Sequence, residues 1–318
     1  MTSHPVRIGL VGCGRLAELG YIPALARVHG AQLVAVADPD PIRRDRAAAI
    51  AATVGEPVAM CTDANTLLER VAPDAVVLAT PAPTHLADAG AAATAGVAVL
   101  VEKPPALDAA GAAALAALTP PPWVGFNRRY DPGAQRVRAA IPADGDVDLR
   151  LEISYRRRSW RAHSVVDDAL LDLGPHLLDW ARWLTRSEVT AVSAAEVGAN
   201  CAVVTVFLGR GRATIVANTD RLHHEVITVR ALAGARLARH SVGGPVAAVL
   251  RRFASGPHPL VNTLVAQLDD FAGAVRGQSP NELGTASDGL AVMSAIDAAR
   301  ASIADGGRVV PVPRSVKA

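Results

Sequence analysis

Short apolar runs alternate with longer helical patterns through the first 126 residues of the chain. Val6–Val11, Leu33–Ala37 and Ala75–Ala79 are rich in Val, Ile, Leu and Ala without polar alternation, which is typical of strands buried on both faces. Helical spacing is found at Leu16–His29, Ile42–Thr53, Leu67–Arg70, His85–Ala95 and Ala109–Leu118. Because strands and helices take turns, the pattern predicts an α/β fold with a doubly wound parallel sheet.

The pattern changes after Thr119–Pro122, where three successive prolines prevent a helix from continuing. Trp123–Phe126 is predicted as the last strand of the first domain, so the predicted domains are residues 1–126 and 127–318. Later segments alternate polar and apolar residues: Leu149–Tyr155, Ala202–Leu208, Arg212–Asn218 and Glu225–Ala231. Helices are predicted at Leu170–Leu184, Val261–Val275 and Ser287–Ile303. The second domain is therefore expected to be α/β with an open, mostly antiparallel sheet.

The composition excludes several classes of protein. The 318 residues suit about two domains of ~150 residues each. Lys+Arg of 32 against Asp+Glu of 30, spread without a basic block, argues against nucleic acid as the main partner. The three cysteines lie far apart without a C-x-x-C pair, which fits a reducing cytoplasm. No run has the length or flanks of a signal peptide or a membrane span, so we expect a cytoplasmic protein without a membrane partner.

A glycine-rich turn follows the first predicted strand. Its sequence, Gly12-Cys13-Gly14-Arg15-Leu16-Ala17, has the form G-x-G-x-x-A, which allows a tight turn and the close approach of a pyrophosphate to a helix start. Asp38 ends the second strand and can accept both ribose hydroxyls of NAD, whereas a 2′-phosphate there would cost about 1–4 kcal/mol in like-charge repulsion. NAD is therefore favoured over NADP. The alternatives are a turn without a ligand, an Asp38 that only caps a helix, and an Arg43 or Arg44 that reaches a phosphate.

Lysine is rare in this chain, since only Lys103 and Lys317 among the 32 basic residues are lysines. Lys103 follows the predicted strand Val99–Val101, at the edge where doubly wound sheets bind their ligands. A lysine ammonium is a compact charge with a pKa that shifts readily, unlike the arginine guanidinium. Lys103 is therefore a candidate for chemistry, and the alternative is a solvated lysine at a strand end.

Asp172 and His176 lie four residues apart at the start of the helix predicted at Leu170–Leu184, so both project from one helix face. Histidine suits general acid/base catalysis near neutral pH, and a neighbouring carboxylate orients its ring. The alternatives are a first-turn carboxylate beside a core histidine, or a metal pair. For a metal, Asp179 is the one further ligand in reach along the helix, so we predict no metal site.

Taken together, these motifs resemble the glucose-fructose oxidoreductase, inositol dehydrogenase and rhizopine catabolism (Gfo/Idh/MocA) family over nearly the whole chain. The matching motifs, in the order of the family, are the glycine turn, Asp38-Pro39, Ala79-Thr80-Pro81 with His85, Glu102-Lys103-Pro104, Gly125 to Pro132, and Asp172-x-Gly174-x-His176-x-x-Asp179. Six motifs in register are specific, although none is decisive alone.

The resemblance implies a Rossmann domain and a C-terminal α/β domain whose open sheet commonly serves as an oligomer face, hence a homodimer or homotetramer. It implies catalysis at a sugar or cyclitol carbon by His176 as base, by Lys103 on the reacting oxygen, and by Asp172 as the group that orients them. The residues it assigns to the NAD site are Gly12, Gly14, Arg15, Leu16, Asp38, Thr80, Pro81, His85, Glu102 and Lys103. Further candidates, for contacts with substrate hydroxyls, are Arg128, Tyr155, Arg157 and Trp160, each of which is alternatively a surface or sheet residue.

The expected function is thus hydride transfer between nicotinamide and a secondary alcohol or ketone carbon of a sugar, sugar nucleotide or cyclitol. Asp167-Asp168 stands where the family usually has a glycine pair, and these two carboxylates favour an amino-sugar or aminocyclitol substrate as one hypothesis. Two alternatives stay open: a cofactor-binding regulator without activity, and a hydrolase that cleaves a glycosidic bond through a redox cycle of bound NAD.

Overall fold

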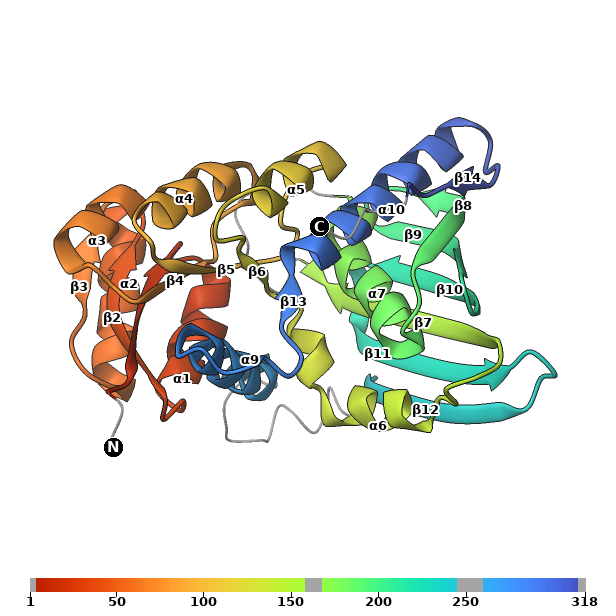
Figure 1. Cartoon of the computed structure of the whole chain (residues 1–318), viewed down its shortest axis with the longest axis horizontal. Helices are drawn as coiled ribbons and strands as arrows, with labels where there is room; N and C mark the ends of the chain where they lie inside the picture. The colour runs from red at the N-terminus through yellow and green to blue at the C-terminus, as the bar shows by residue number, and fades with distance from the viewer. Residues whose placement is uncertain (1–3, 158–167, 245–259, 314–318) are drawn as a thin grey trace. The chain divides into compact units, whose positions relative to one another are not determined.

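The computed structural model describes residues 4–157, 168–244 and 260–313 of the chain. These residues form two compact units, each of which is made of two separate stretches of sequence (Figure 1). The first unit comprises Met1–Tyr130 and Gly256–Gly289. The second comprises Asp131–Ser255 and Leu290–Ala318.

The first unit contains a seven-stranded sheet in the order β13-β6-β5-β4-β1-β2-β3. Its strands are β1 (Val6–Val11), β2 (Ala31–Ala37), β3 (Ala59–Cys61), β4 (Ala75–Leu78), β5 (Ala98–Val101), β6 (Trp123–Val124) and β13 (Gly284–Thr285). All neighbours pair in parallel except β13, which is antiparallel to β6. This arrangement confirms the predicted doubly wound sheet, in which the chain order reverses beside β1.

Helices cover both faces of this sheet. Figure 1 shows α3 (Ala64–Val71), α4 (Ala82–Thr94) and α5 (Ala109–Ala116) along one face, and α1 (Ile22–Leu25) and α9 (Leu260–Val275) on the other. The first unit also contains α2 (Pro41–Val54), the π-helix η1 (Ala17–Tyr21) and the 3-10 helix η2 (Asn127–Tyr130). Such two-sided cover explains why these strands are apolar without alternation.

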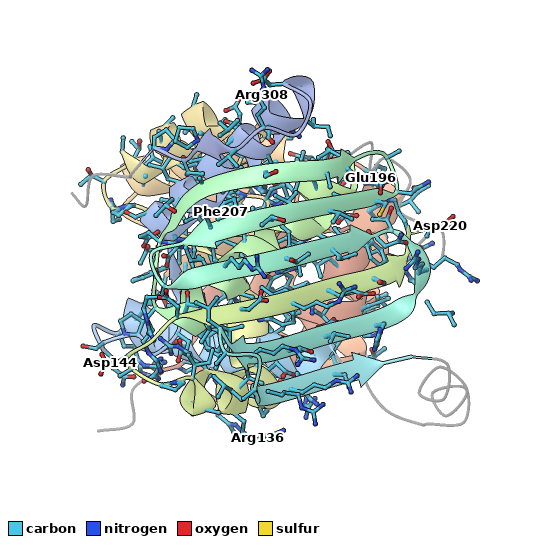
Figure 2. The ribbon with its side chains drawn as sticks, turned by 90° about the vertical axis from the view of Figure 1, so that its right-hand side faces the viewer. Arg136, Asp144, Glu196, Phe207, Asp220 and Arg308 are labelled. Atoms are coloured by element: carbon cyan, nitrogen blue, oxygen red, sulfur yellow. The ribbon has the colours of Figure 1, made fainter. Side chains whose placement is uncertain are left out.

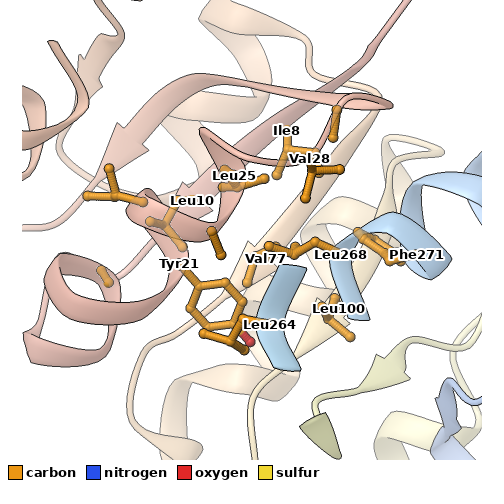
Figure 3. Close-up of a cluster of buried hydrophobic side chains, with 14 of the residues drawn as sticks. Ile8, Leu10, Tyr21, Leu25, Val28, Val77, Leu100, Leu264, Leu268 and Phe271 are labelled. Carbon is orange, nitrogen blue, oxygen red and sulfur yellow. The ribbon is translucent and has the colours of Figure 1, made fainter. Parts of the chain in front are cut away.

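Helix α9 completes the core of the first unit although it lies far along the sequence. Leu264, Leu268 and Phe271 are buried in one cluster with Ile8 and Leu10 of β1 (Figure 3). The structure therefore divides the chain differently from the predicted domains 1–126 and 127–318, because residues 256–289 group with the first unit. The physical reason is that the apolar side of α9 finds its partner on the parallel sheet.

The second unit also contains a seven-stranded sheet, in the order β12-β11-β7-β10-β9-β8-β14. Its strands are β7 (Val147–Arg156), β8 (Val189–Val197), β9 (Cys201–Leu208), β10 (Gly211–Asn218), β11 (Asp220–Ala231), β12 (Arg236–Gly243) and β14 (Val310–Pro311). Only the β7–β10 pair is parallel, so the expected mostly antiparallel sheet is confirmed.

Helix α7 (Ala169–Thr185) packs on one face of this sheet, against β7 to β10. The buried and half-buried residues of β9 and β10 alternate accordingly. Figure 2 shows the opposite face, where among the described residues no helix lies in front of side chains such as Phe207 and Glu196. The unit is completed by α6 (Pro132–Ala140) and by most of α10 (Ala286–Ala304). The second unit thus has one covered and one open sheet face, as predicted.

Candidate functional site

The glycine turn joins β1 to η1, and its two glycines have different surroundings. Gly12 has a φ of +95°, and an added Cβ would lie 2.7 Å from the carbonyl carbon and oxygen of Ala79. Glycine is therefore required at position 12, both because of the positive φ and because the carbonyl group of Ala79, at the end of β4, leaves no room for a Cβ. At Gly14, in contrast, an added Cβ would meet no described heavy atom within 4 Å. Packing gives no reason for glycine at position 14, whereas the close approach of a ligand does.

The helix after this turn begins at Arg15, directly after Gly14, which has no side chain that could cap it. Five other helices differ in this respect, because an aspartate carboxylate accepts hydrogen bonds at the start of α2, α3, α5, α6 and α7. Uncapped N–H groups together with the helix dipole favour an anion. The turn therefore suits the pyrophosphate of a dinucleotide, and Gly14 has the open space that such a group requires.

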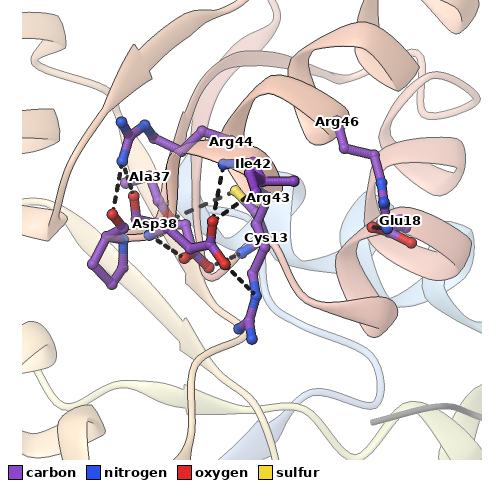
Figure 4. A network of polar contacts seen from close by, with 10 residues as sticks. Cys13, Glu18, Ala37, Asp38, Ile42, Arg43, Arg44 and Arg46 are labelled. Atoms are coloured by element: carbon purple, nitrogen blue, oxygen red, sulfur yellow. Dashed lines mark hydrogen bonds and ion pairs between the residues drawn. The ribbon is translucent and has the colours of Figure 1, made fainter. Parts of the chain in front are cut away.

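Asp38 is held beside the turn by two backbone N–H groups (Figure 4). Cys13 N donates to Asp38 Oδ2 at 2.9 Å, and Asp40 N donates to Asp38 Oδ1 at 2.9 Å. The carboxylate is buried at the carboxyl end of β2, next to the first residues of the turn. Its role as a helix cap is excluded, since Asp40 and not Asp38 caps α2.

The two arginines after Asp38 both have partners within the protein. Arg44 Nη1 donates to the carbonyl oxygens of Asp38 at 2.5 Å and of Pro39 at 3.1 Å. Arg43 Nε lies 3.2 Å from Asp40 Oδ2. These contacts tie both guanidinium groups to the loop after β2, as Figure 4 shows, and neither is held by contacts with the glycine turn.

The remaining predicted residues of the turn lie at its surface. Arg15 is exposed, and its Nη1 pairs with Glu18 Oε2 at 2.9 Å. Leu16 is half-buried at the start of η1. The turn thus offers one guanidinium group and backbone N–H groups on the same edge of the sheet.

The carboxyl ends of β4, the neighbour of β1, and of β5, the next strand, contribute the next group of predicted residues. Thr80 and Lys103 are half-buried and Pro81 is exposed, so all three have surface at this edge. The parallel strands therefore bring Gly12, Thr80 and Lys103 to one edge of the first unit, which is the edge where doubly wound folds bind ligands.

Glu102 and His85 are buried beneath that edge and have partners within the protein. Glu102 Oε1 accepts from the Tyr21 hydroxyl at 2.5 Å, and Oε2 accepts from Lys103 N at 2.9 Å. Burial raises the pKa of Glu102 above its ordinary value. The ring of His85 lies between the carbonyl oxygens of Thr80 and Pro105. Neither Tyr21 nor Pro105 is among the predicted site residues, because a tyrosine in a helix and a proline in a loop carry no signal of such contacts.

In the second unit, the structure brings three of the predicted residues together. The Tyr155 hydroxyl donates to Asp172 Oδ2, and Arg157 Nη2 donates to the same oxygen at 2.9 Å. Asp172 is 8% exposed and His176, one turn further along α7, is 6% exposed. Burial and the charge of Asp172 raise the pKa of Tyr155 well above its ordinary value. Tyr155 therefore stays protonated and remains a donor to the carboxylate.

Other predicted residues lie elsewhere. Arg128 is half-buried in η2 of the first unit. Asp168 caps α7, since its Oδ1 accepts from Leu171 N at 2.7 Å, and its Oδ2 lies 3.5 Å from Arg300 Nη2. Trp160 and Asp167 lie outside the described residues. The cap gives Asp168 a structural role that the amino-substrate hypothesis did not consider.

Among the described residues, no group of three or more His, Cys, Asp or Glu side chains is arranged to hold a metal ion. None of the described helices has the length and apolar character to cross a membrane.

Residues 6–120 match the model of an oxidoreductase family with an NAD-binding Rossmann fold. Among relatives, the chain is 35% identical to inositol 2-dehydrogenase 4 of Saccharopolyspora erythraea over 61% of this chain and 58% of that protein. It is 28% identical to the rhizopine catabolism protein MocA of Rhizobium meliloti over 92% of this chain and 93% of that protein. The alignments with several inositol 2-dehydrogenases span somewhat more than half the length of those relatives, 58% and 57% for two of them.

Solved structures share the fold over the whole chain. The myo-inositol dehydrogenase of Lactobacillus casei, in complex with NAD(H) and myo-inositol, has a TM-score of 0.79 and 18% identity, with 99% of both chains covered. The scyllo-inositol dehydrogenase of the same organism, with NAD(H) and scyllo-inositol, has a TM-score of 0.78 and 19% identity, with 97% of this chain and 99% of that chain covered. At these identities the likeness concerns the fold.

Proposed function

We propose that the chain belongs to the Gfo/Idh/MocA oxidoreductase family and is an NAD-dependent dehydrogenase that transfers hydride to or from a CH–OH carbon of a cyclitol or related sugar. The observation that supports this most is the array of Gly14, Asp38 and Lys103 at the carboxyl ends of the strands of one parallel sheet. The cyclitol class is proposed because the relatives include inositol dehydrogenases.

NAD is the proposed cofactor, and when bound it supplies the hydride chemistry. The residues proposed to hold it are the glycine turn, Asp38 and the exposed edge at Thr80 and Pro81. Asp38 is fixed by two N–H groups, which orients the carboxylate that would accept ribose hydroxyls. Arg43 and Arg44 pair with the loop after β2, which supports NAD over NADP because a 2′-phosphate needs a cationic partner.

We propose that His176 takes the proton of the reacting hydroxyl, and returns it in the reverse direction. Lys103 is proposed to hydrogen bond the reacting oxygen, and Asp172 to orient these groups. Tyr155 and Arg157 bind Asp172, so we propose that they fix its carboxylate rather than grip substrate hydroxyls directly. Arg128 and Trp160 remain proposed contacts of the substrate.

The first experiment is a titration of the protein with NADH and separately with NADPH, followed by nicotinamide fluorescence. We expect tighter binding of NADH, and reduction of NAD in the presence of myo-inositol or scyllo-inositol. Lys103→Ala and His176→Ala should each lower kcat about 100- to 10,000-fold with NADH binding retained. Failure of both cofactors to bind would overturn the proposal. Binding of NADH without turnover of any polyol would favour the non-catalytic regulator, and release of free sugar without net NADH would favour the glycosidase.

The open face of the second sheet is proposed as the contact surface of a homodimer or homotetramer, since half-buried side chains of β9 and β10 alternate along it. Light scattering coupled to size exclusion tests this, and a monomer would overturn it. A cytoplasmic location is proposed as well, because all three cysteines are free thiols and Cys13 and Cys61 are buried.

A further inference from the structure

The His85 ring connects two loops that leave neighbouring strands of the parallel sheet. His85 lies in α4 and is 1% exposed. Its Nδ1 is 3.1 Å from the carbonyl oxygen of Pro105, and its Nε2 is 2.9 Å from the carbonyl oxygen of Thr80. Thr80 follows β4, and Pro105 follows β5 by way of Lys103. One buried side chain thus contacts both loops.

The loop after β5 has few ways to be held by its own backbone. Glu102 N donates to Leu78 O at 2.9 Å as the sheet pairing ends, and Lys103 N then donates to the side chain of Glu102. The next two residues, Pro104 and Pro105, have no N–H to donate. The backbone of these two prolines can therefore form hydrogen bonds only through its carbonyl oxygens, and the contact of Pro105 with His85 is of that kind.

The two ring contacts are not equivalent in a neutral imidazole, which carries a single N–H. Burial lowers the pKa of His85 and so favours the neutral ring, although the carbonyl oxygens of Pro105, Thr80 and Pro104 and the charge of Asp88 oppose this shift. In a neutral ring, the nitrogen that carries the proton donates a hydrogen bond to its carbonyl oxygen. The other nitrogen only brings its lone pair towards the second carbonyl oxygen. The tautomer decides which of the two loops the ring holds.

We propose that His85 is a positioning residue that donates from Nδ1 to the carbonyl oxygen of Pro105, which is buried and needs a donor more than the carbonyl oxygen of half-buried Thr80, and so fixes the segment carrying Lys103. This role rests on the dehydrogenase function proposed above. His85 does not contact substrate or cofactor in this role; it acts through the backbone two residues beyond Lys103. A displacement of a catalytic group by about 1 Å lowers rates by up to about 100-fold.

Two conservative variants separate the two contacts. In His85→Asn the amide nitrogen takes the place of Nδ1 and can still donate to Pro105. In His85→Gln the amide nitrogen takes the place of Nε2 and can donate to Thr80 instead. We expect His85→Asn to keep kcat within about 3-fold of the unmodified protein, and His85→Gln to lower kcat about 10- to 100-fold with NADH affinity unchanged.

The rarity of lysine provides a direct readout of the position of Lys103. Growth on carbon-13-labelled lysine gives NMR signals from Lys103 and Lys317 alone, and Lys317→Arg assigns them. A role limited to the stability of α4 would leave the Lys103 signal unmoved in both folded variants. We expect this signal to stay in place in His85→Asn and to shift or broaden in His85→Gln, while the Lys317 signal stays constant.

Equal behaviour of the two variants, whether both match the unmodified protein or both lose the native Lys103 signal, would overturn the proposal. So would the reverse order, which would assign the ring to Thr80. If the unmodified protein oxidises no polyol, the proposed function fails, but the NMR comparison still decides whether His85 positions Lys103.

Discussion

Gly12 and Gly14 allow the proposed cofactor site to be tested by two substitutions of the same size. Gly12→Ala places a methyl group on a backbone with a φ of +95° and 2.7 Å from the carbonyl of Ala79. The conformational strain costs about 1–3 kcal/mol, and the overpacking against backbone about 1–3 kcal/mol more. Since about 1 kcal/mol lowers Tm by about 2–4 °C in a domain of this size, we expect Tm to fall by about 5–20 °C.

Gly14→Ala is the matched control, because its methyl group would meet no described heavy atom within 4 Å. We expect its Tm to stay within about 2 °C of the unmodified protein. Its Kd for NADH should rise about tenfold or more, which corresponds to about 1.4 kcal/mol lost from close contact with the pyrophosphate. Thermal scanning and fluorescence titration measure the two effects separately. Equal losses of Tm in both variants, or unchanged NADH affinity in Gly14→Ala, would refute the assignment of these two roles.

Three further substitutions test the core and the buried polar contacts. Leu264→Ala, in α9, should lower the free energy of unfolding by about 2–5 kcal/mol in urea titrations; an unchanged midpoint would contradict the place of α9 in the first core. Tyr155→Phe removes a donor to buried Asp172 and should lower kcat about tenfold without changing the Kd for NADH; full activity would show that the Tyr155 hydroxyl is not needed to hold Asp172. Burial raises the pKa of Glu102, so the folded state binds the carboxyl proton more tightly than the unfolded state does. The stability that this carboxyl contributes therefore falls as the pH rises from 4.5, the ordinary pKa of a glutamate, towards the raised pKa of the folded state. Glu102→Gln has no carboxyl to titrate, so its stability lacks this pH dependence. The Tm of the variant minus that of the unmodified protein should therefore increase as the pH rises through this window; a Tm difference independent of pH would contradict the raised pKa of Glu102.

The sequence predicted most of the elements that bury a regular apolar face, and several of those it missed have a short or interrupted one. The three-residue strand β3 has only Cys61 buried, and the edge strand β12 has no fully buried residue, so neither carries an apolar pattern. Strand β8 was also not predicted, and two register shifts against β9 interrupt its alternation. The pattern of α9 predicted a helix with an apolar side, but periodicity does not say which sheet covers that side.

For the candidate site, spacing placed the glycine turn, Asp38 and Lys103 at one sheet edge, because parallel strands end together. Spacing could not show that Tyr155 and Arg157 contact Asp172, since β7 and α7 meet only through tertiary packing. Nor could it show that His85 and Glu102 are enclosed by protein atoms. Both residues follow the motifs at the correct interval, and only their depth in the structure distinguishes holding a loop from lining a surface.

The discontinuous first unit has a consequence for the order of folding during synthesis. The strands β1 to β6 leave the ribosome well before α9, and at about 5–20 residues per second the roughly 140 residues from Tyr130 to Phe271 take about 7–28 s. Throughout that interval this core cluster lacks the side chains that α9 later contributes. Domains that are contiguous in sequence fold from the N-terminus onward. In this chain, however, most of the second unit is synthesised before α9, which completes the core of the first unit. The apolar side chains beneath α9 therefore stay uncovered by it until residues 260–275 have been synthesised, and the last of the helices to join the first unit is the one that completes its core.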